Sequence, residues 1–282
     1  MAISTVGVVG SGIMGSGLAE VIARGGMNVI VRSRSQATAD AMVASVAKGL
    51  AKQVEKGRLT DDEKAAILGR ITAVSELSKL ADCDLVIESV VEDLDTKKAL
   101  FAELDKTVKP GAIIATNTST LPVIELAMCT GRPELVCGIH FFNPATAMPL
   151  VEIVRPLSAS DDTIAAATAF AEACGKQPVQ VKDRAGFIVN ALLFPYLNNA
   201  VRMLEQGTAN MADIDTAMKG GCNFPMGPFA LLDLVGLDTS LAILDALYNE
   251  FRDPNYAAIP TLRRMVAAGQ LGRKTKAGFY TY

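Results

Sequence analysis

Residues 3–26, ISTVGVVGSGIMGSGLAEVIARGG, decide the fold of the N-terminal part of this chain. A short β-branched run at residues 3–9 leads into three glycines, and apolar residues then recur at helical spacing, which predicts a strand, a turn and a helix. Gly10 permits the tight turn, Gly12 lets the backbone approach a pyrophosphate, and Gly15 allows close helix packing. Because the N–H groups at a helix start suit phosphates, we interpret the segment as a dinucleotide-binding motif; the alternative is a glycine turn without a ligand.

The second predicted strand, NVIVRSRS at residues 28–35, indicates which dinucleotide is bound. NAD-binding versions usually carry an acidic residue about 20 residues after the glycines, where its carboxylate binds the ribose hydroxyls. Here this position is Ser33, and Arg32 and Arg34 flank it. Because guanidinium groups suit a phosphate, the sequence predicts NADP(H) rather than NAD(H), although two arginines at a strand end can also be an ordinary solvated surface.

Strands and helices alternate as far as residue 182. Runs rich in Val and Ile recur as DLVIESVVE, GAIIATNTST, LVCGIHFF, LVEIVRP and QPVQV, with helical stretches between several of them. Such alternation implies a parallel sheet covered on both faces. From about Asp183 the pattern changes to long apolar helices. We therefore predict a Rossmann-type doubly wound α/β domain over residues 1–182 and an all-helical C-terminal domain over residues 183–282.

A helical hairpin is expected inside the first domain, at residues 36–68. Its second helix begins at TDDE, in which Thr60 and Glu63 fit a capping box. Its first helix carries lysines at every fourth position, which therefore line one face: Lys48, Lys52 and Lys56. Such a stripe is commonly only solvated, but it can also hold the phosphates of a bulky anionic substrate.

Composition excludes several classes of protein. The 27 basic and 30 acidic side chains give a net charge of −3, so there is no general attraction to nucleic acid or to an anionic membrane. Five widely spaced cysteines without a CxxC pair, and a single histidine, provide no metal site and indicate reduced, mostly buried thiols. Without a basic leader or an apolar run approaching roughly 18 residues, we expect a cytoplasmic protein.

The helical part is unusually apolar. The stretch FALLDLVGLDTSLAILDALY, residues 229–248, offers more than one apolar helix face. A partner normally buries such a surface, so a homodimer is the simplest expectation, and a fully intramolecular core is the alternative.

His140 is the only histidine of the chain and stands in GIHFFNPATAMPLVEIV, residues 138–154. It falls at the end of an apolar strand, where open α/β sheets bind their ligands, and Glu152 lies in the following strand. If these strands are neighbours, the imidazole and the carboxylate can pair. An imidazole exchanges protons at physiological pH, and a carboxylate on its other nitrogen fixes the tautomer. The pair is therefore a candidate general base with its orienting group; alternatively, a histidine on an apolar strand is a hydrogen-bonded core residue.

In these motifs the sequence resembles the L-3-hydroxyacyl-CoA dehydrogenases, especially the short bacterial 3-hydroxybutyryl-CoA dehydrogenases. The resemblance covers essentially the whole chain and rests on long motifs in the same order: GVVGSGIMGSGLA, DLVIESVVEDLDTKKALFAEL, ATNTSTLPV, GIHFFNPATAMPLVEIV, DRAGFIVNALLFPYLNNAVRMLEQG, DIDTAMKGGCNFPMGPFALLDLVGLD and GQLGRKTKAGFYTY. It implies that the protein transfers a hydride between a nicotinamide cofactor and an acyl-CoA.

The resemblance also implies roles for residues near the reacting carbon. His140 corresponds to the general base that acts on the 3-hydroxyl, and Glu152 corresponds to its partner. Three further residues match the polar groups that line the reacting end of the substrate: Ser119 of NTST, Asn143 of FFNP and Asn190 of GFIVNALL.

Other matches concern the cofactor and the CoA. Glu92 and Lys97 match residues that contact the cofactor. To these expected contacts we add Asn117, together with two residues of the glycine turn, Ile13 and Met14. The lysine-bearing hairpin matches the region near which the CoA tail lies, which implies a role for Lys48 and Lys52.

One position departs from the family pattern. Members that use NAD carry an acidic residue where this chain has Ser33, so the sequence points to NADPH and toward reduction in the cell. We expect an enzyme that interconverts acetoacetyl-CoA, or a similar 3-oxoacyl-CoA, and the (S)-3-hydroxyacyl-CoA. Two alternatives stay open. One is the same chemistry on an acyl-carrier-protein thioester or a free hydroxy acid with NAD(H), and the other is a non-catalytic dinucleotide-binding protein.

Overall fold

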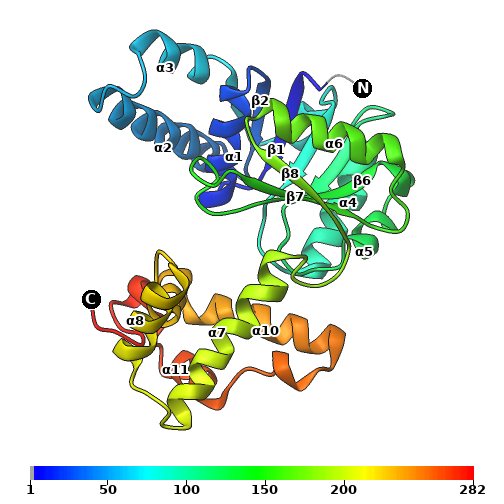
Figure 1. Ribbon diagram of the computed structural model, residues 1–282. Coiled ribbons are helices and arrows are strands. Elements are labelled where there is room, and N and C mark those ends of the chain that lie inside the picture. The colour runs from blue at the N-terminus through cyan, green and yellow to red at the C-terminus, as the bar shows by residue number, and fades with distance from the viewer. Residues whose placement is uncertain (1–2) are drawn as a thin grey trace. The chain divides into compact units, whose positions relative to one another are not determined.

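The chain folds into two compact units that meet in the sequence after Asp183, and the computed structural model describes residues 3–282 (Figure 1). A sheet rich in parallel strands with flanking helices forms the first unit, and only helices and short turns form the second. The fold class expected from the sequence is confirmed.

Eight strands form one sheet in the order β3-β2-β1-β4-β5-β6-β7-β8. Their bounds are β1 (Thr5–Val9), β2 (Asn28–Arg32), β3 (Ile71–Val74), β4 (Leu85–Glu88), β5 (Ile113–Thr116), β6 (Val136–Phe141), β7 (Leu150–Arg155) and β8 (Gln177–Lys182). The expectation of a parallel sheet is wrong for one pair, because β6 and β7 run antiparallel. The link between them, residues 142–149, is shorter than the dozen or so residues that a parallel crossover requires.

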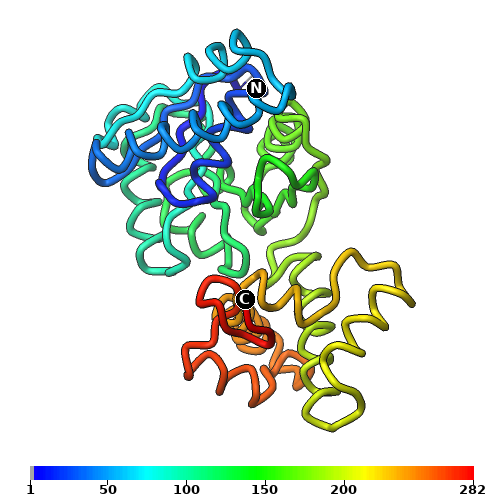
Figure 2. Tube along the Cα trace, turned by 90° about the vertical axis from the view of Figure 1, so that its left-hand side faces the viewer, coloured from blue at the N-terminus to red at the C-terminus, as the bar shows by residue number. Residues whose placement is uncertain are grey.

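Helices of the first unit pack against this sheet and against one another. Their bounds are α1 (Ile13–Arg24), α2 (Gln36–Glu55), α3 (Asp61–Leu68), α4 (Leu94–Thr107), α5 (Val123–Ala127) and α6 (Asp161–Ala173), with short 3₁₀ turns η1 (Leu77–Leu80) and η2 (Pro133–Leu135). The α2 and α3 helices pack together as a hairpin, light blue in Figures 1 and 2. The capping box at its second helix is confirmed, because Thr60 accepts from the Glu63 N–H and the Glu63 carboxylate accepts from the Thr60 N–H.

The second unit has its own apolar core. The unit consists of five helices and two short 3₁₀ turns, yellow-green to red in Figure 2: α7 (Val189–Glu205), α8 (Met211–Cys222), α9 (Pro228–Val235), α10 (Leu237–Phe251), α11 (Pro260–Ala267), η3 (Pro254–Tyr256) and η4 (Arg273–Thr275). Two buried carboxylates join its parts. Asp215 accepts from the N–H groups that start α9, and Asp233 accepts from the N–H groups of Phe279 and Tyr280. A buried carboxylate is stable only when it is hydrogen-bonded. The bonds to Asp233 therefore hold the C-terminal segment against α9.

All five cysteines are unpaired thiols, and Cys83, Cys137 and Cys174 are buried. Burial raises the pKa of each of these three thiols to about 12, so they are chemically inert at neutral pH. Cys222 is exposed and Cys129 is half-buried. Across residues 3–282, no helix combines the length and the apolar character needed to cross a membrane, and no cluster of three or more His, Cys, Asp or Glu side chains is arranged for a metal ion.

Candidate active site at the carboxyl edge of the sheet

The turn between β1 and α1 needs two of its glycines for the fold and leaves space at the third. Gly10 has φ +125°, and a Cβ there would lie 2.2 Å from the Ser89 carbonyl oxygen. A Cβ at Gly15 would lie 2.0 Å from the Gly10 oxygen, so α1 can approach β1 only because Gly15 has no side chain. A Cβ at Gly12 would meet nothing within 4 Å. Since no side chain of the described chain caps α1, this space before the helix start fits a pyrophosphate.

A methyl group at Gly12 is therefore expected to act on the ligand rather than on the fold. We expect Gly12→Ala to unfold at nearly the parent temperature but to bind a nicotinamide dinucleotide about tenfold more weakly or worse, as an overpacked contact would. Gly15→Ala must move backbone and should lower the unfolding temperature. Thermal unfolding and fluorescence titration with NADH and NADPH measure both effects. Undiminished affinity of Gly12→Ala for both dinucleotides would contradict this use of the glycine turn.

The end of β2 brings hydroxyl groups together beside the glycine turn. Ser33 is buried, and its Oγ lies 2.9 Å from Ser11 Oγ and 2.6 Å from Thr38 Oγ1. Of the two arginines, Arg32 donates from Nε to the Ser75 carbonyl oxygen at 3.0 Å, whereas Arg34 is exposed. The position that carries a carboxylate in NAD-binding versions of the fold is thus a small hydroxyl with an exposed guanidinium next to it.

The structure pairs His140 with Glu152. In the antiparallel register of β6 and β7 these residues stand directly opposite each other, and His140 Nδ1 lies 2.7 Å from Glu152 Oε2. Both side chains are buried, at 4% and 1% exposure. A carboxylate oxygen at this distance suits a proton on Nδ1, and the tautomer with that proton leaves a lone pair on Nε2.

Nε2 faces the turn that follows β5. Ser119 Oγ lies 3.2 Å from His140 Nε2, and the ring of Phe142 packs against the imidazole with centroids 4.5 Å apart. Asn117 ties the same turn to β6, because its Oδ1 accepts from the Phe141 N–H at 2.8 Å. The Ser119 N–H donates to Glu92 Oε1 at 3.0 Å. These groups meet at the carboxyl edge of the sheet, which the glycine turn shares, since β1, β4, β5 and β6 are parallel.

The remaining predicted residues lie in different surroundings. Lys97 is only 1% exposed, and its Nζ lies 2.7 Å from Glu88 and 3.1 Å from Glu92. Ile13 is 78% exposed and Met14 is half-buried at the start of α1. Three of these predicted residues are exposed on the first unit: Asn143 in the link after β6, and Lys48 and Lys52 on α2. Asn190 is buried near the start of α7 in the second unit.

Several polar residues of this region were not predicted. Glu88 and Thr116, at the ends of β4 and β5, are fully buried, and Ser11 and Thr38 contact Ser33. A sequence signal existed for Glu88, because it is a charged residue closing the apolar strand LVIE. None existed for Ser11 and Thr38, whose contacts depend on where α1 and α2 start.

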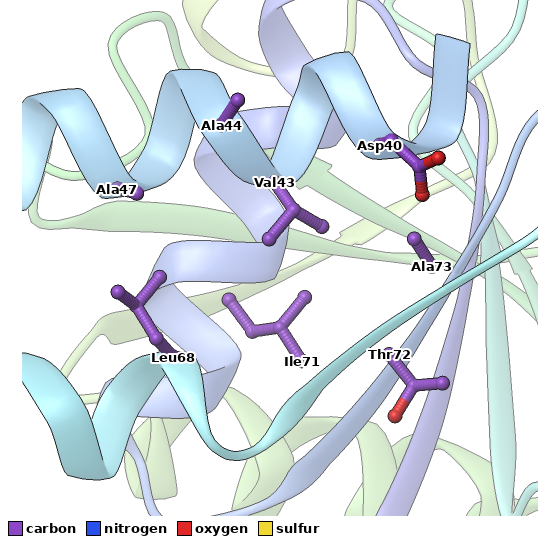
Figure 3. Close-up of a pocket in the computed structure, with 8 residues that line it drawn as sticks. All are labelled: Asp40, Val43, Ala44, Ala47, Leu68, Ile71, Thr72 and Ala73. Carbon is purple, nitrogen blue, oxygen red and sulfur yellow. The ribbon is translucent and has the colours of Figure 1, made fainter. Parts of the chain in front are cut away.

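A separate hollow lies between α2, α3 and β3 (Figure 3). Its lining is mostly apolar and contains none of the predicted site residues: Asp40, Val43, Ala44, Ala47, Leu68, Ile71, Thr72 and Ala73. The polar groups that converge around His140 therefore distinguish the candidate site better than this hollow does.

Comparison with known proteins follows the same division of the chain. Residues 5–184 match the NAD binding domain of 3-hydroxyacyl-CoA dehydrogenase, and residues 186–282 match its C-terminal domain. The chain is 48% identical to a 3-hydroxybutyryl-CoA dehydrogenase of Mycobacterium tuberculosis over 283 residues, which covers 100% of this chain and 99% of that protein. It is 46% identical to the 3-hydroxybutyryl-CoA dehydrogenase of Clostridioides difficile, with 98% of each chain covered.

A solved structure shares the architecture as well. The crystal structure of (S)-3-hydroxybutyryl-CoA dehydrogenase PaaH1 from Ralstonia eutropha matches with a TM-score of 0.97 and 44% identity, covering 100% of this chain and 99% of that one. Both domain matches and these full-length likenesses agree with the resemblance drawn from the motifs. The chain belongs to the 3-hydroxyacyl-CoA dehydrogenase family.

Proposed function

We propose that this protein interconverts a 3-oxoacyl-CoA, with acetoacetyl-CoA as the first candidate, and the (S)-3-hydroxyacyl-CoA by hydride transfer with a nicotinamide cofactor. The observation that carries the proposal is the imidazole of His140, held at 2.7 Å by Glu152 and at 3.2 Å from the Ser119 hydroxyl. It lies at the same edge of the sheet as the glycine turn. The names of the related 3-hydroxybutyryl-CoA dehydrogenases support the substrate class.

A nicotinamide cofactor, when bound at the glycine turn, would supply or accept the hydride at C3 of the substrate. In the oxidation direction, His140 Nε2 accepts the proton of the 3-hydroxyl while the Ser119 hydroxyl holds the substrate oxygen. Glu152 keeps the imidazole in the tautomer with a bare Nε2 and stabilises the imidazolium that forms. In reduction, Nε2–H returns the proton to the oxygen. We assign the reacting end of the substrate also to Asn143 and Asn190, and the CoA phosphates to Lys48 and Lys52.

We propose NADP(H) as the preferred cofactor, with NAD(H) as the alternative. The support comes from the end of β2, where Ser33 replaces a carboxylate and Arg34 is exposed. A carboxylate at this position would bind the ribose hydroxyls of NAD and repel the 2′-phosphate of NADP, whereas a serine does not repel that phosphate and a neighbouring guanidinium group suits it.

Ser33→Asp is expected to reverse this preference. The new carboxylate should lower kcat/KM for NADPH relative to NADH by about 10²-fold, the combined result of repelling the phosphate and binding the ribose. Steady-state rates with both nicotinamides, at saturating acetoacetyl-CoA, give the ratio. Arg34→Gln should weaken only the NADPH reaction, while the exposed Arg264 on α11 provides a matched control, Arg264→Gln, that leaves both unchanged. A parent enzyme with the higher kcat/KM for NADH would overturn the proposed preference.

We also propose roles for the two parts of the chain. Residues 1–182 are assigned as the dinucleotide-binding domain and residues 183–282 as the substrate and dimerisation domain. Large apolar side chains exposed on the second unit support a homodimer: Ile188, Leu192, Met203, Phe224 and Leu234. A partner normally covers side chains of this kind where they form a contiguous patch.

A further inference from the structure

A buried ion pair beneath the candidate site has no part in the proton transfer described above. Glu88, at the end of β4, is 0% exposed, and Lys97 of α4 is 1% exposed. Glu88 Oε1 lies 2.7 Å from Lys97 Nζ and accepts from the Val90 N–H at 2.6 Å, while Oε2 accepts from the Thr116 hydroxyl at 2.7 Å. Apolar side chains of similar volume usually stabilise a fold as well as a buried ion pair does, so stability alone does not explain this one.

The hydrogen bonds of Glu88 lead from β4 to the turn that carries Ser119. The first route passes through Thr116, whose hydroxyl donates to Glu88 and accepts from the Thr118 N–H at 3.1 Å. Along this route the backbone at the start of the turn is tied to a buried carboxylate that has hydrogen-bond partners on both of its oxygens.

The second route passes through Lys97. Its Nζ lies 3.1 Å from Glu92 Oε2, and Glu92 Oε1 accepts both from the Thr118 hydroxyl and from the Ser119 N–H, the latter at 3.0 Å. Lys97 therefore joins the buried carboxylate to the half-exposed one and holds Glu92 against the turn. Both routes end within one residue of the Ser119 side chain.

We infer that Glu88 is a positioning residue: through Thr116 and Lys97 it fixes the turn after β5 and so places the Ser119 hydroxyl opposite His140. The effect on turnover rests on the proposed function, whereas the placement of the turn does not. Fully connected polar networks of this kind hold a reacting group in one geometry, which a partly satisfied network cannot do.

Thr116→Val tests the inference with the smallest change. The substitution removes the hydroxyl that links Glu88 to the turn and keeps the volume of the side chain. We expect kcat for acetoacetyl-CoA reduction to fall about 10- to 100-fold, since a misplacement of about 1 Å near the reacting atoms has effects of this size. KM for acetoacetyl-CoA should stay within about threefold of the parent value, because the lost interaction acts on the transition state. Thr116→Ser should restore turnover, and Glu88→Gln should lower it.

Thr163 provides a matched control on α6. It is 1% exposed, and its hydroxyl donates to the Glu134 carbonyl oxygen at 2.7 Å, outside this network. Thr163→Val removes an equally buried hydroxyl and should lower the unfolding temperature as Thr116→Val does, yet it should leave kcat unchanged. An equal loss of kcat in the two variants would mean that Thr116 acts only through stability, and the inference would be overturned.

A second readout does not depend on the substrate. Because His140 is the only histidine of the chain, the untagged protein gives a single set of imidazole NMR signals. These signals should shift in Thr116→Val and Glu88→Gln but stay in place in Thr163→Val. Parent-like imidazole signals in Thr116→Val would overturn the inference. If the parent protein reduces no 3-oxoacyl-CoA with either nicotinamide, the proposed function is refuted. The NMR comparison would then still decide whether Glu88 positions the turn after β5.

Discussion

His140→Ala is expected to lose about 10²- to 10⁴-fold in kcat while it still folds and binds its nicotinamide cofactor. The imidazole is the group placed between Glu152 and the Ser119 hydroxyl at the carboxyl edge of the sheet, so its loss removes the proton acceptor and donor together. The expected loss appears in kcat for both directions of the reaction. Steady-state assays with acetoacetyl-CoA and with (S)-3-hydroxybutyryl-CoA measure it.

A second substitution separates chemistry from packing at this position. Alanine leaves a cavity beside the buried Glu152 carboxylate, which alone can destabilise the strand pair. His140→Gln retains side-chain volume and an amide donor for Glu152, but it has no group that exchanges protons near neutral pH. It should therefore unfold close to the parent temperature and still lose turnover. If His140→Gln keeps parent turnover, the assignment of His140 as general base is wrong.

Glu152→Gln should produce the second largest effect, a fall in kcat of as much as about 10⁴-fold, which is the size known for removing the orienting carboxylate of a catalytic histidine. The Gln amide can donate to Nδ1, which moves the ring proton to Nε2 and leaves no lone pair for the substrate hydroxyl. The negative charge that stabilises the imidazolium is lost as well. Affinity for the nicotinamide cofactor should stay near the parent value, because the glycine turn and the end of β2 are unchanged.

The matched control for this change is Glu20→Gln. Glu20 is 7% exposed on α1 and forms an ion pair with Arg24 at 3.0 Å, so the substitution also removes a buried, paired carboxylate. It should cost some stability and little turnover. Comparing kcat with the unfolding temperature of both variants shows whether Glu152 acts on the imidazole. A Glu152→Gln enzyme that retains most of its turnover would show that His140 needs no orienting carboxylate.

Much of the fold follows from local sequence patterns. The strand, glycine turn and helix at residues 3–26 are encoded by β-branched residues, by glycines and by helical spacing, and each of these acts over a few residues. The β3 strand was not expected, because ITAV is only four residues long and contains the polar Thr72 and the small Ala73, which leaves no long apolar run to detect. The antiparallel entry of β7 was also missed, since Val- and Ile-rich runs read the same in either direction.

The sequence alone identified the residue types of the candidate site: a single histidine at the end of an apolar strand, an acidic residue in the next strand, and three glycines at the required spacing. Only the tertiary structure decided which atoms meet. The register of β6 against β7 sets the 2.7 Å contact between His140 and Glu152, and the turn after β5 brings Ser119 to the other ring nitrogen. The tertiary structure also places Lys97 in a buried ion pair with Glu88. The physical reason is that periodicity records which face of an element is apolar, whereas strand register and hydrogen-bond partners depend on segments far apart in the chain.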